Sequence, residues 1–248
     1  MTFTLVQDKL PLTEECKHYT KEHQVPAEIQ KYWHQRKSIF EFYDYDVRLT
    51  DDAWFGVTPE PVANQIAKDL TPATPNHTLI DIFAGAGGNT IAFAMSEKWS
   101  RIIAIEKDAA TLACAQHNAE VYGVAEYITW IHGDSFEYLS QLKSDQSSLD
   151  PAIQTHLSTT TVFASPPWGG VNYRDHPVFD LSTMEPYNLE HLHEACKPME
   201  HVLFLPRTSD IRQVAKLAPA DKKIDVVQYC MEGASKAMVV HVPAQGSS

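Results

Sequence analysis

The chain has 248 residues, of which 44% are hydrophobic and 21% charged, a composition typical of a folded globular protein and not of a disordered one. Its formal net charge of −12 excludes a broad basic groove for long nucleic acid, so any contact with nucleic acid must be local. Four dispersed cysteines without a CxxC pair argue against a zinc cluster or a disulfide framework, and for a reducing, intracellular compartment. No apolar run approaches the roughly 20 residues needed to span a bilayer, so we expect a soluble protein with no membrane partner.

The pattern of apolar residues changes at about residue 55. Residues 1–55 lack a strand-like run, and apolar side chains at helical spacing over 26–43 predict an amphipathic helix, so we expect a small N-terminal helical extension. Thr58 is expected to be the N-cap of a further helix that continues to residue 70. Residues 56–248 are expected to form one core domain.

From residue 79 onward, short apolar strands alternate with helices, which predicts parallel strands joined by crossover helices. The strands are expected at residues 79–83, 102–105, 127–131, 161–164 and 201–205. The helices between and after them are expected at 89–97, 109–122, 135–142, 189–195 and 209–217. Residues 224–230 and 237–242 read as a closing hairpin, and residues 143–160 as a surface insertion. The fold class is therefore a doubly wound, mostly parallel α/β sheet with an antiparallel edge.

Polar and glycine residues follow the first three strands of the core, where a nucleotide-like ligand binds in such folds. The first strand ends in a glycine-rich turn with Gly85 and Gly87, although a purely structural turn shows the same pattern. Glu106 ends the second strand and can accept both hydroxyls of a ribose. Asp81 can face an ammonium group, and Asp134 can accept from an adenine amino group. Together these residues predict S-adenosylmethionine, with S-adenosylhomocysteine as product and no metal, because a pyrophosphate cofactor disfavours a nearby carboxylate.

The sequence Ser165-Pro166-Pro167-Trp168 follows the fourth strand of the core, next to the expected cofactor. Two prolines remove two amide donors, so a rigid turn with carbonyl and hydroxyl acceptors remains. Such a turn can hold the N–H groups of an exocyclic amine, and Trp168 offers a ring on which a base can stack. A proline loop with a core Trp is the alternative, but Gly169-Gly170 continues an open loop. We therefore assign Ser165, Pro166 and Trp168 as catalytic residues.

Six blocks of the sequence resemble the catalytic domain of the trimethylguanosine synthase family in order and spacing, and the match as a whole runs from about residue 29 to residue 242. They are KYWHQR (31–36), WFGVTPE (54–60), DIFAGAGGN (81–89), NAEVYG (118–123), SPPWGG (165–170) and LPR (205–207). The SPPW motif alone also admits other amino-methyltransferases, whereas the amino-terminal blocks together with LPR are far more specific.

The resemblance implies a Rossmann-like class I methyltransferase that adds two methyl groups, in succession, to the 2-amino group of a 7-methylguanosine cap on small nuclear and nucleolar RNAs. It also implies location in the nucleus or nucleolus, with Sm-type or small nucleolar ribonucleoprotein partners. By matching motif positions it assigns cofactor contact to Thr58, the base edge to Asn118, and the cap phosphates to Lys31 and Arg207. Tyr173 is a further candidate for the phosphates, although a half-buried loop tyrosine is nearly as good an interpretation.

The chemistry agrees with the implied substrate. A 7-methylated guanine is positively charged, so stacking on Trp168 gains a cation–π interaction that unmethylated guanine lacks. No strong general base is expected, because the methylated aniline-like nitrogen loses its proton to a weak acceptor, and Ser165 then orients the amine. Two alternatives remain: an amino-methyltransferase for an internal base, which would need more basic surface, and a silent cap-binding module, which the intact motifs disfavour.

Overall fold

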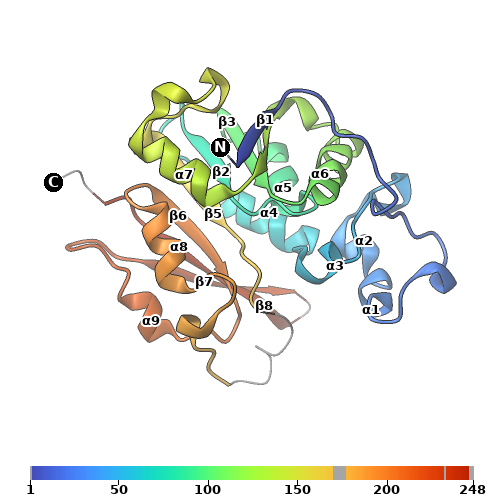
Figure 1. The fold of residues 1–248 in the computed structure, drawn as a ribbon. Coiled ribbons are helices and arrows are strands. Elements are labelled where there is room, and N and C mark those ends of the chain that lie inside the picture. The colour runs from blue at the N-terminus through green and yellow to red at the C-terminus, as the bar shows by residue number, and fades with distance from the viewer. Residues whose placement is uncertain (1, 170–176, 232, 246–248) are drawn as a thin grey trace.

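The computed structural model describes residues 2–169, 177–231 and 233–245, and these form one eight-stranded mixed sheet with helices on both faces (Figure 1). The strand order is β1-β4-β3-β2-β5-β6-β8-β7. The strands are β1 (Phe3–Val6), β2 (Thr78–Asp81), β3 (Arg101–Glu106), β4 (Ile128–Gly133), β5 (Thr160–Ala164), β6 (Glu200–Leu205), β7 (Asp225–Met231) and β8 (Ala234–Val242). The five strands β4, β3, β2, β5 and β6 pair in parallel, and antiparallel strands flank them on both sides. The predicted α/β class, with its mostly parallel sheet and antiparallel edge, is confirmed.

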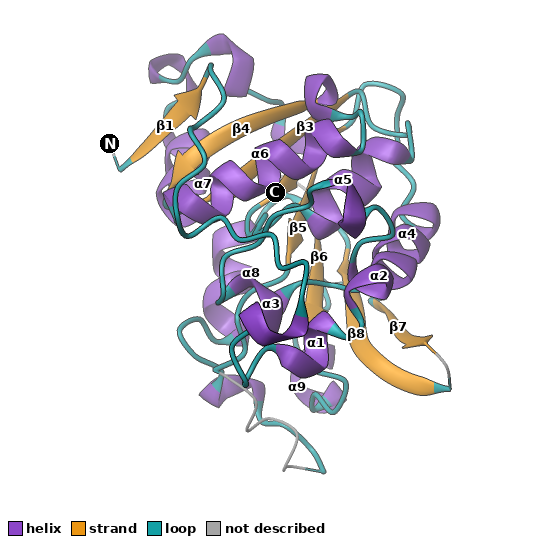
Figure 2. Cartoon of the chain, turned by 90° about the vertical axis from the view of Figure 1, so that its right-hand side faces the viewer, coloured by secondary structure: helices purple, strands orange, loops and turns teal. Residues whose placement is uncertain are grey.

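Side chains alternate between the two faces of the sheet, as strand geometry requires. Leu79 and Ile102 pack in one core, while Ile80 and Ile103 pack in the other. The first core is covered by the helices α4 (Glu60–Asp69), α5 (Gly88–Met95) and α6 (Ala109–Val121). The second is covered by α7 (Ser135–Ser144), α8 (Leu189–Cys196) and α9 (Ile211–Ala215), and Figure 2 shows the sheet between these layers.

The amino-terminal segment differs from the single helix expected over residues 26–43. It forms the short helices α1 (Gln30–Trp33), α2 (Arg36–Ile39) and α3 (Ala53–Gly56), with 3-10 turns η1 (Glu22–Gln24) and η2 (Tyr43–Tyr45). Helix α1 ends before Gln35, whose ψ of 11° is not helical. Trp33, the last residue of α1, is 7% exposed and donates from Nε1 to the Tyr19 carbonyl at 2.8 Å. The aromatic residues of the predicted apolar stripe are thus buried by a folded-back chain and not by one continuous helix.

Strand β1 was not expected before residue 55. It pairs antiparallel with β4, from Phe3 opposite Gly133 to Val6 opposite Trp130, so the first residues of the chain extend the sheet. Four residues without a β-branched run give little sequence signal, and the pairing edge of β4 is what makes them a strand. The expected boundary between residues 55 and 56 reflects a change in the sequence pattern. The sheet itself contains strands from both sides of this boundary.

Two smaller expectations need correction. Thr58 is not an N-cap, because α4 begins at Glu60 and Pro59 occupies the cap position. The segment 143–160 is more than a surface insertion, since Leu149 and Ile153 are 5% and 2% exposed and pack in the second core. This segment contains the turns η4 (Gln146–Ser148), η5 (Pro151–Ile153) and η6 (Leu157–Thr159). Two further short turns are η3 (Ala125–Tyr127) and η8 (Leu181–Thr183).

Gly133 tests the importance of β1. Its φ is +142°, and a Cβ placed on it would clash with the Thr2 carbonyl oxygen and the Phe3 Cα. We expect Gly133→Ala to lower the free energy of unfolding by about 1–3 kcal/mol, because the backbone of β1 would have to move away. Urea denaturation measures this change. Gly56→Ala is the matched control, since nothing lies within 4 Å of its Cβ position, and equal stability of the two variants would contradict the expectation.

Candidate functional site

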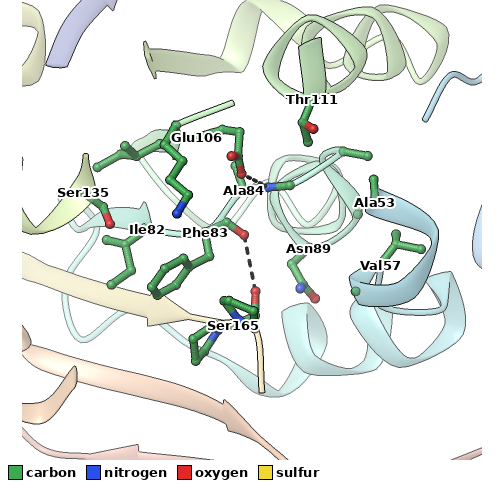
Figure 3. A pocket seen from close by; sticks show the side chains of 18 of the residues that line it. Ala53, Val57, Ile82, Phe83, Ala84, Asn89, Glu106, Thr111, Ser135 and Ser165 are labelled. Carbon is green, nitrogen blue, oxygen red and sulfur yellow. Dashed lines mark hydrogen bonds between the residues drawn. The ribbon is translucent and has the colours of Figure 1, made fainter. Parts of the chain in front are cut away.

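A pocket lies at the carboxyl ends of β2, β3, β4 and β5, where parallel strands bring their following loops together. Figure 3 shows side chains that line it, which come from segments far apart in the chain. Among these are α3 with the following residues 57–58, the glycine turn after β2, the ends of β3 and β4, the Ser-Pro-Pro turn after β5, and the separate residues Thr111 and Tyr187. Of the expected cofactor residues, Thr58, Gly85, Glu106 and Asp134 line this pocket.

A hydrogen bond from a backbone amide to a side-chain carboxylate joins the glycine turn to Glu106. Gly85 has a φ of +54°, which a glycine adopts without strain, and its amide donates to Glu106 Oε2 at 2.9 Å. Glu106 Oε1 accepts from the Asp108 amide at 2.9 Å. Burial raises the pKa of Glu106, while these amides favour its charged form. The result is a carboxylate whose position is set from two sides and which faces the pocket (Figure 3).

Gly87 has a structural role in the turn. It does not line the pocket, and it forms the N-cap of α5 with a φ of +93°. A Cβ there would lie 3.1 Å from Ile91 Cδ1 and 3.4 Å from the Ala115 Cα. Gly87 therefore allows the turn to enter α5 close to α6, and its effect on a ligand is indirect.

Asp81 lies beneath the pocket and does not line it. It is fully buried, with Oδ2 accepting from the Thr90 hydroxyl at 2.7 Å and Oδ1 from the Phe83 amide at 3.2 Å. Burial raises its pKa to about 6, an effect that these two hydrogen bonds oppose. In this arrangement Asp81 supports the turn that follows β2, and its expected contact with an ammonium group stays a prediction.

Asn89 supplies a polar atom that the sequence analysis missed. Its Nδ2 donates to Thr58 Oγ1 at 3.0 Å, and Figure 3 shows the amide on the Val57 side of the pocket. Asn89 is 7% exposed, and its Oδ1 has no hydrogen-bond partner among the described residues. An unpaired buried acceptor costs about 1–3 kcal/mol, so a ligand N–H placed here would be favoured. The first turn of α5 also has no capping side chain, which leaves its amides for a carboxylate.

Asp134 is the N-cap of α7. Its Oδ1 accepts from the amides of Phe136 and Glu137 at 2.8 and 3.1 Å, so the pocket-facing carboxylate is held at the helix terminus. An aromatic wall lies beside it, made by Phe83 and Tyr187, whose rings are 5.7 Å apart. The ring centroids of Tyr187 and Phe136 are 4.5 Å apart. The sequence analysis missed Tyr187 because it comes from a loop distant in the chain.

The Ser-Pro-Pro turn lies in the pocket wall as expected from its place after β5. Ser165, Pro166 and Pro167 line the pocket, and Ser165 Oγ donates to the Phe83 carbonyl at 3.4 Å (Figure 3). Trp168 is half-buried outside the pocket lining. Its ring stacks on Phe204 at 5.7 Å with 17° between planes, and its Nε1 donates to the Phe204 carbonyl at 3.3 Å. The stack orients the indole by covering one of its faces.

The expected substrate residues have different surroundings. Lys31 is exposed on α1, with Nζ 4.8 Å from the centroid of the Tyr32 ring, and Arg207 is exposed directly after β6. Neither lines the pocket, so both belong to its periphery at most. Tyr173 lies outside the described residues.

Asn118 is fully buried and does not line the pocket. Its Oδ1 accepts from the Arg48 amide at 2.7 Å, and its Nδ2 donates to the carbonyls of Arg48 and Ala86 at 2.8 and 2.9 Å. The side chain expected at a base edge therefore connects the amino-terminal segment to the glycine turn. The reason is geometric: residue 118 is on the face of α6 that packs against both segments.

These contacts give a test of the role of Asn118. Asn118→Ala would leave three buried backbone groups without their partner, so we expect the free energy of unfolding to fall by about 2 kcal/mol or more. Urea denaturation measures this loss, with the exposed Asn76→Ala as the matched control. Unchanged stability together with weaker substrate binding would contradict the structural role and support contact with the base.

Comparisons with known proteins identify the family. A sequence profile of the RNA cap guanine-N2 methyltransferases matches residues 76–245. The chain is 35% identical over 226 residues to the trimethylguanosine synthase of Schizosaccharomyces pombe, covering 90% of this chain and 89% of that protein. It is 31% identical over 195 residues to that of Saccharomyces cerevisiae, covering 77% and 58% of the two chains.

A solved structure described as a methyltransferase from Porphyromonas gingivalis superimposes with a TM-score of 0.60 at 16% identity, over 88% of this chain and 51% of that one, which supports the fold alone. Among the residues that the structure describes, no helix is long and apolar enough to cross a membrane. The profile match and the yeast relatives establish the activity class. The chain belongs to the RNA cap guanine-N2 methyltransferase family, S-adenosylmethionine-dependent enzymes that methylate the cap guanine of an RNA substrate.

Proposed function

We propose that this enzyme adds two methyl groups in succession to N2 of a 7-methylguanosine cap and so produces the 2,2,7-trimethylguanosine cap. The observation that carries the proposal is the position of Ser165, Pro166 and Pro167 in the wall of the pocket that also contains Glu106. The two prolines lack amide donors, so the turn presents oxygen acceptors to an amine. The names of the two yeast relatives support the same product.

The cofactor site we propose follows the pocket from Asp134 to Asn89. Asp134 and the aromatic wall at Tyr187 receive the adenine, and Glu106 receives the ribose hydroxyls. Asn89 and the first turn of α5 receive the amino-acid end. Thr58 orients Asn89 through the 3.0 Å hydrogen bond, and Gly85, Gly87 and Asp81 hold the shape of the turn. When bound, S-adenosylmethionine supplies an electrophilic methyl group on sulfur.

The catalytic groups act mainly by positioning. Ser165 and the Pro166 turn hold the N–H groups of the 2-amino nitrogen so that its lone pair faces the methyl group. A bond forms between nitrogen and carbon, the carbon–sulfur bond breaks, and the nitrogen loses one proton to water. Trp168 stacks on the methylated guanine, and the positive charge of that base adds a cation–π attraction. This attraction makes prior 7-methylation a requirement.

We propose further that Lys31 and Arg207, with Tyr173, contact the cap phosphates, since both cations are exposed on an otherwise acidic protein. Asn118 acts on the base through the segments that it connects. From the family resemblance we propose small nuclear and nucleolar RNAs as the natural substrates. The enzyme would then act in the nucleus or nucleolus, with Sm-type or small nucleolar ribonucleoproteins as partners. No metal is required.

Methyl transfer to cap dinucleotides tests this function directly. We expect two successive additions to a 7-methylated cap dinucleotide and none to the unmethylated one, with products resolved by mass. Trp168→Ala should remove nearly all turnover while leaving S-adenosylmethionine affinity within about twofold, because stacking involves the base and not the cofactor. Trp168→Phe should retain part of the activity. Equal turnover on both caps, or full activity of Trp168→Ala, would refute the proposal.

The unpaired Asn89 oxygen gives a separate test of the cofactor site. Asn89→Leu removes the acceptor at similar volume, so we expect the affinity for S-adenosylmethionine to fall by about tenfold or more, the loss of one hydrogen bond to a charged donor. Isothermal titration calorimetry measures this without turnover. Asn76→Leu, far from the pocket on the exposed surface, serves as control. Unchanged affinity of Asn89→Leu would remove Asn89 from the site.

A further inference from the structure

The segment 17–37 has a charge opposite to that of the rest of the chain. It contains five Lys or Arg and two Glu, a formal charge of +3, together with His18, His23 and His34. The other 227 residues carry fifteen Lys or Arg against thirty Asp or Glu, a formal charge of −15. A polyanion is therefore repelled by most of this molecule and attracted only locally. We call residues 17–37 the basic segment.

Three cations of the basic segment are not neutralised by a neighbour. Lys37 and Arg36 lie 2.6 and 4.0 Å from the carboxylate of Asp44, so these two cations share one carboxylate partner. By contrast, no carboxylate of the described residues lies within 4.0 Å of Lys17, Lys21 or Lys31. Lys21 and Lys31 are exposed, and Lys17 is half-buried. The three cations without a carboxylate partner are thus two near the start of the segment and one on α1.

The folded-back chain gathers these residues on one part of the molecule. Trp33 of α1 donates to the Tyr19 carbonyl at 2.8 Å, and His34 lies 3.3 Å from Glu22. Residues 19–22 therefore pack against α1, which carries Lys31. Figure 1 shows this blue segment with α1 and α2 at one side of the molecule.

The same part of the molecule continues to the rim of the pocket. The rings of Tyr32 and Phe55 are in edge contact at 5.5 Å, so α1 packs on α3. Helix α3 supplies Ala53 and Gly56 to the pocket lining. Phe55 itself is 45% exposed, which leaves an aromatic side chain between the pocket and the basic segment. Helix α1, which carries Lys31, thus packs on the pocket-lining helix α3, and Tyr19 and Glu22 contact α1 in turn.

We propose that the basic segment binds the phosphodiester backbone of the RNA that follows the cap, with Lys17 and Lys21 contacting phosphates beyond those of the cap itself. This inference rests on the proposed function, which puts the cap at the pocket and its phosphates at Lys31. Single-stranded RNA fits because it is flexible and its charge matches three unpaired cations, while the acidic remainder of the surface keeps it on this path. The segment adds affinity for RNA without reading its sequence.

Binding of two ligands to one variant tests the inference. The variant is Lys17→Gln with Lys21→Gln, and the ligands are the 7-methylated cap dinucleotide and an unstructured 12-nucleotide RNA with the same cap. We expect affinity for the capped RNA to fall by about tenfold at low salt, with the slope of log K against log salt reduced by about 1.4, because each lost phosphate contact contributes about 0.7. Affinity for the dinucleotide should remain within about twofold.

The matched control changes two exposed lysines elsewhere, Lys216→Gln with Lys223→Gln, and so alters net charge equally. An equal loss of RNA affinity in the control, or an unchanged salt slope in the test variant, would overturn the inference, as would a parallel loss of dinucleotide binding. Melting temperatures of both variants verify folding. Failure of the unsubstituted enzyme to methylate the cap dinucleotide would instead refute the proposed function.

Discussion

Parallel pairing of β2 with both β3 and β5 is the constraint on which the site depends. Asp81 is opposite Ala104 on one side and Phe163 on the other, so the glycine turn, Glu106 and Ser165 all leave the sheet at one edge. Backbone hydrogen bonds set this register, and a shift of one residue would turn each of these side chains to the other face. The pocket is thus built by strand ends, with few contacts between its polar side chains.

A second layer of buried polar groups holds the loops in that place. Asp81 bonds Thr90 and Phe83 beneath the pocket, and Asn118 joins Arg48 to Ala86 at its side. Each group would cost free energy if it lost its partner, so the loops are restricted to arrangements that satisfy them all. Asn89 differs from these two residues, because its buried Oδ1 has no hydrogen-bond partner in the part of the chain that the structure describes. A site that binds a polar ligand is where such an unpaired group is expected.

The acidic surface and the basic segment together limit where a polyanion can bind. Net charge alone excluded a broad nucleic-acid groove, yet the fold packs Tyr19 of the basic segment against α1, which carries Lys31 and contacts α3. Repulsion over most of the surface and attraction at one place restrict where a polyanion can lie. An enzyme that acts on one end of an RNA benefits from this restriction, because the rest of its surface does not attract internal parts of the RNA chain.

The sequence by itself determined the fold class and those site residues that directly follow strands. Glu106, Asp134 and Ser165 could be predicted because a parallel sheet brings all carboxyl ends to one edge, whatever the remaining packing. The turn at Gly85 was predictable for the same reason. Only the tertiary structure decided the rest: β1 pairs with the edge of β4, Trp33 bonds the carbonyl of Tyr19, and Asn118 bonds Arg48 and Ala86 and does not line the pocket. These outcomes depend on partners distant in the chain, and local patterns carry no information about which distant group will satisfy a buried donor or acceptor.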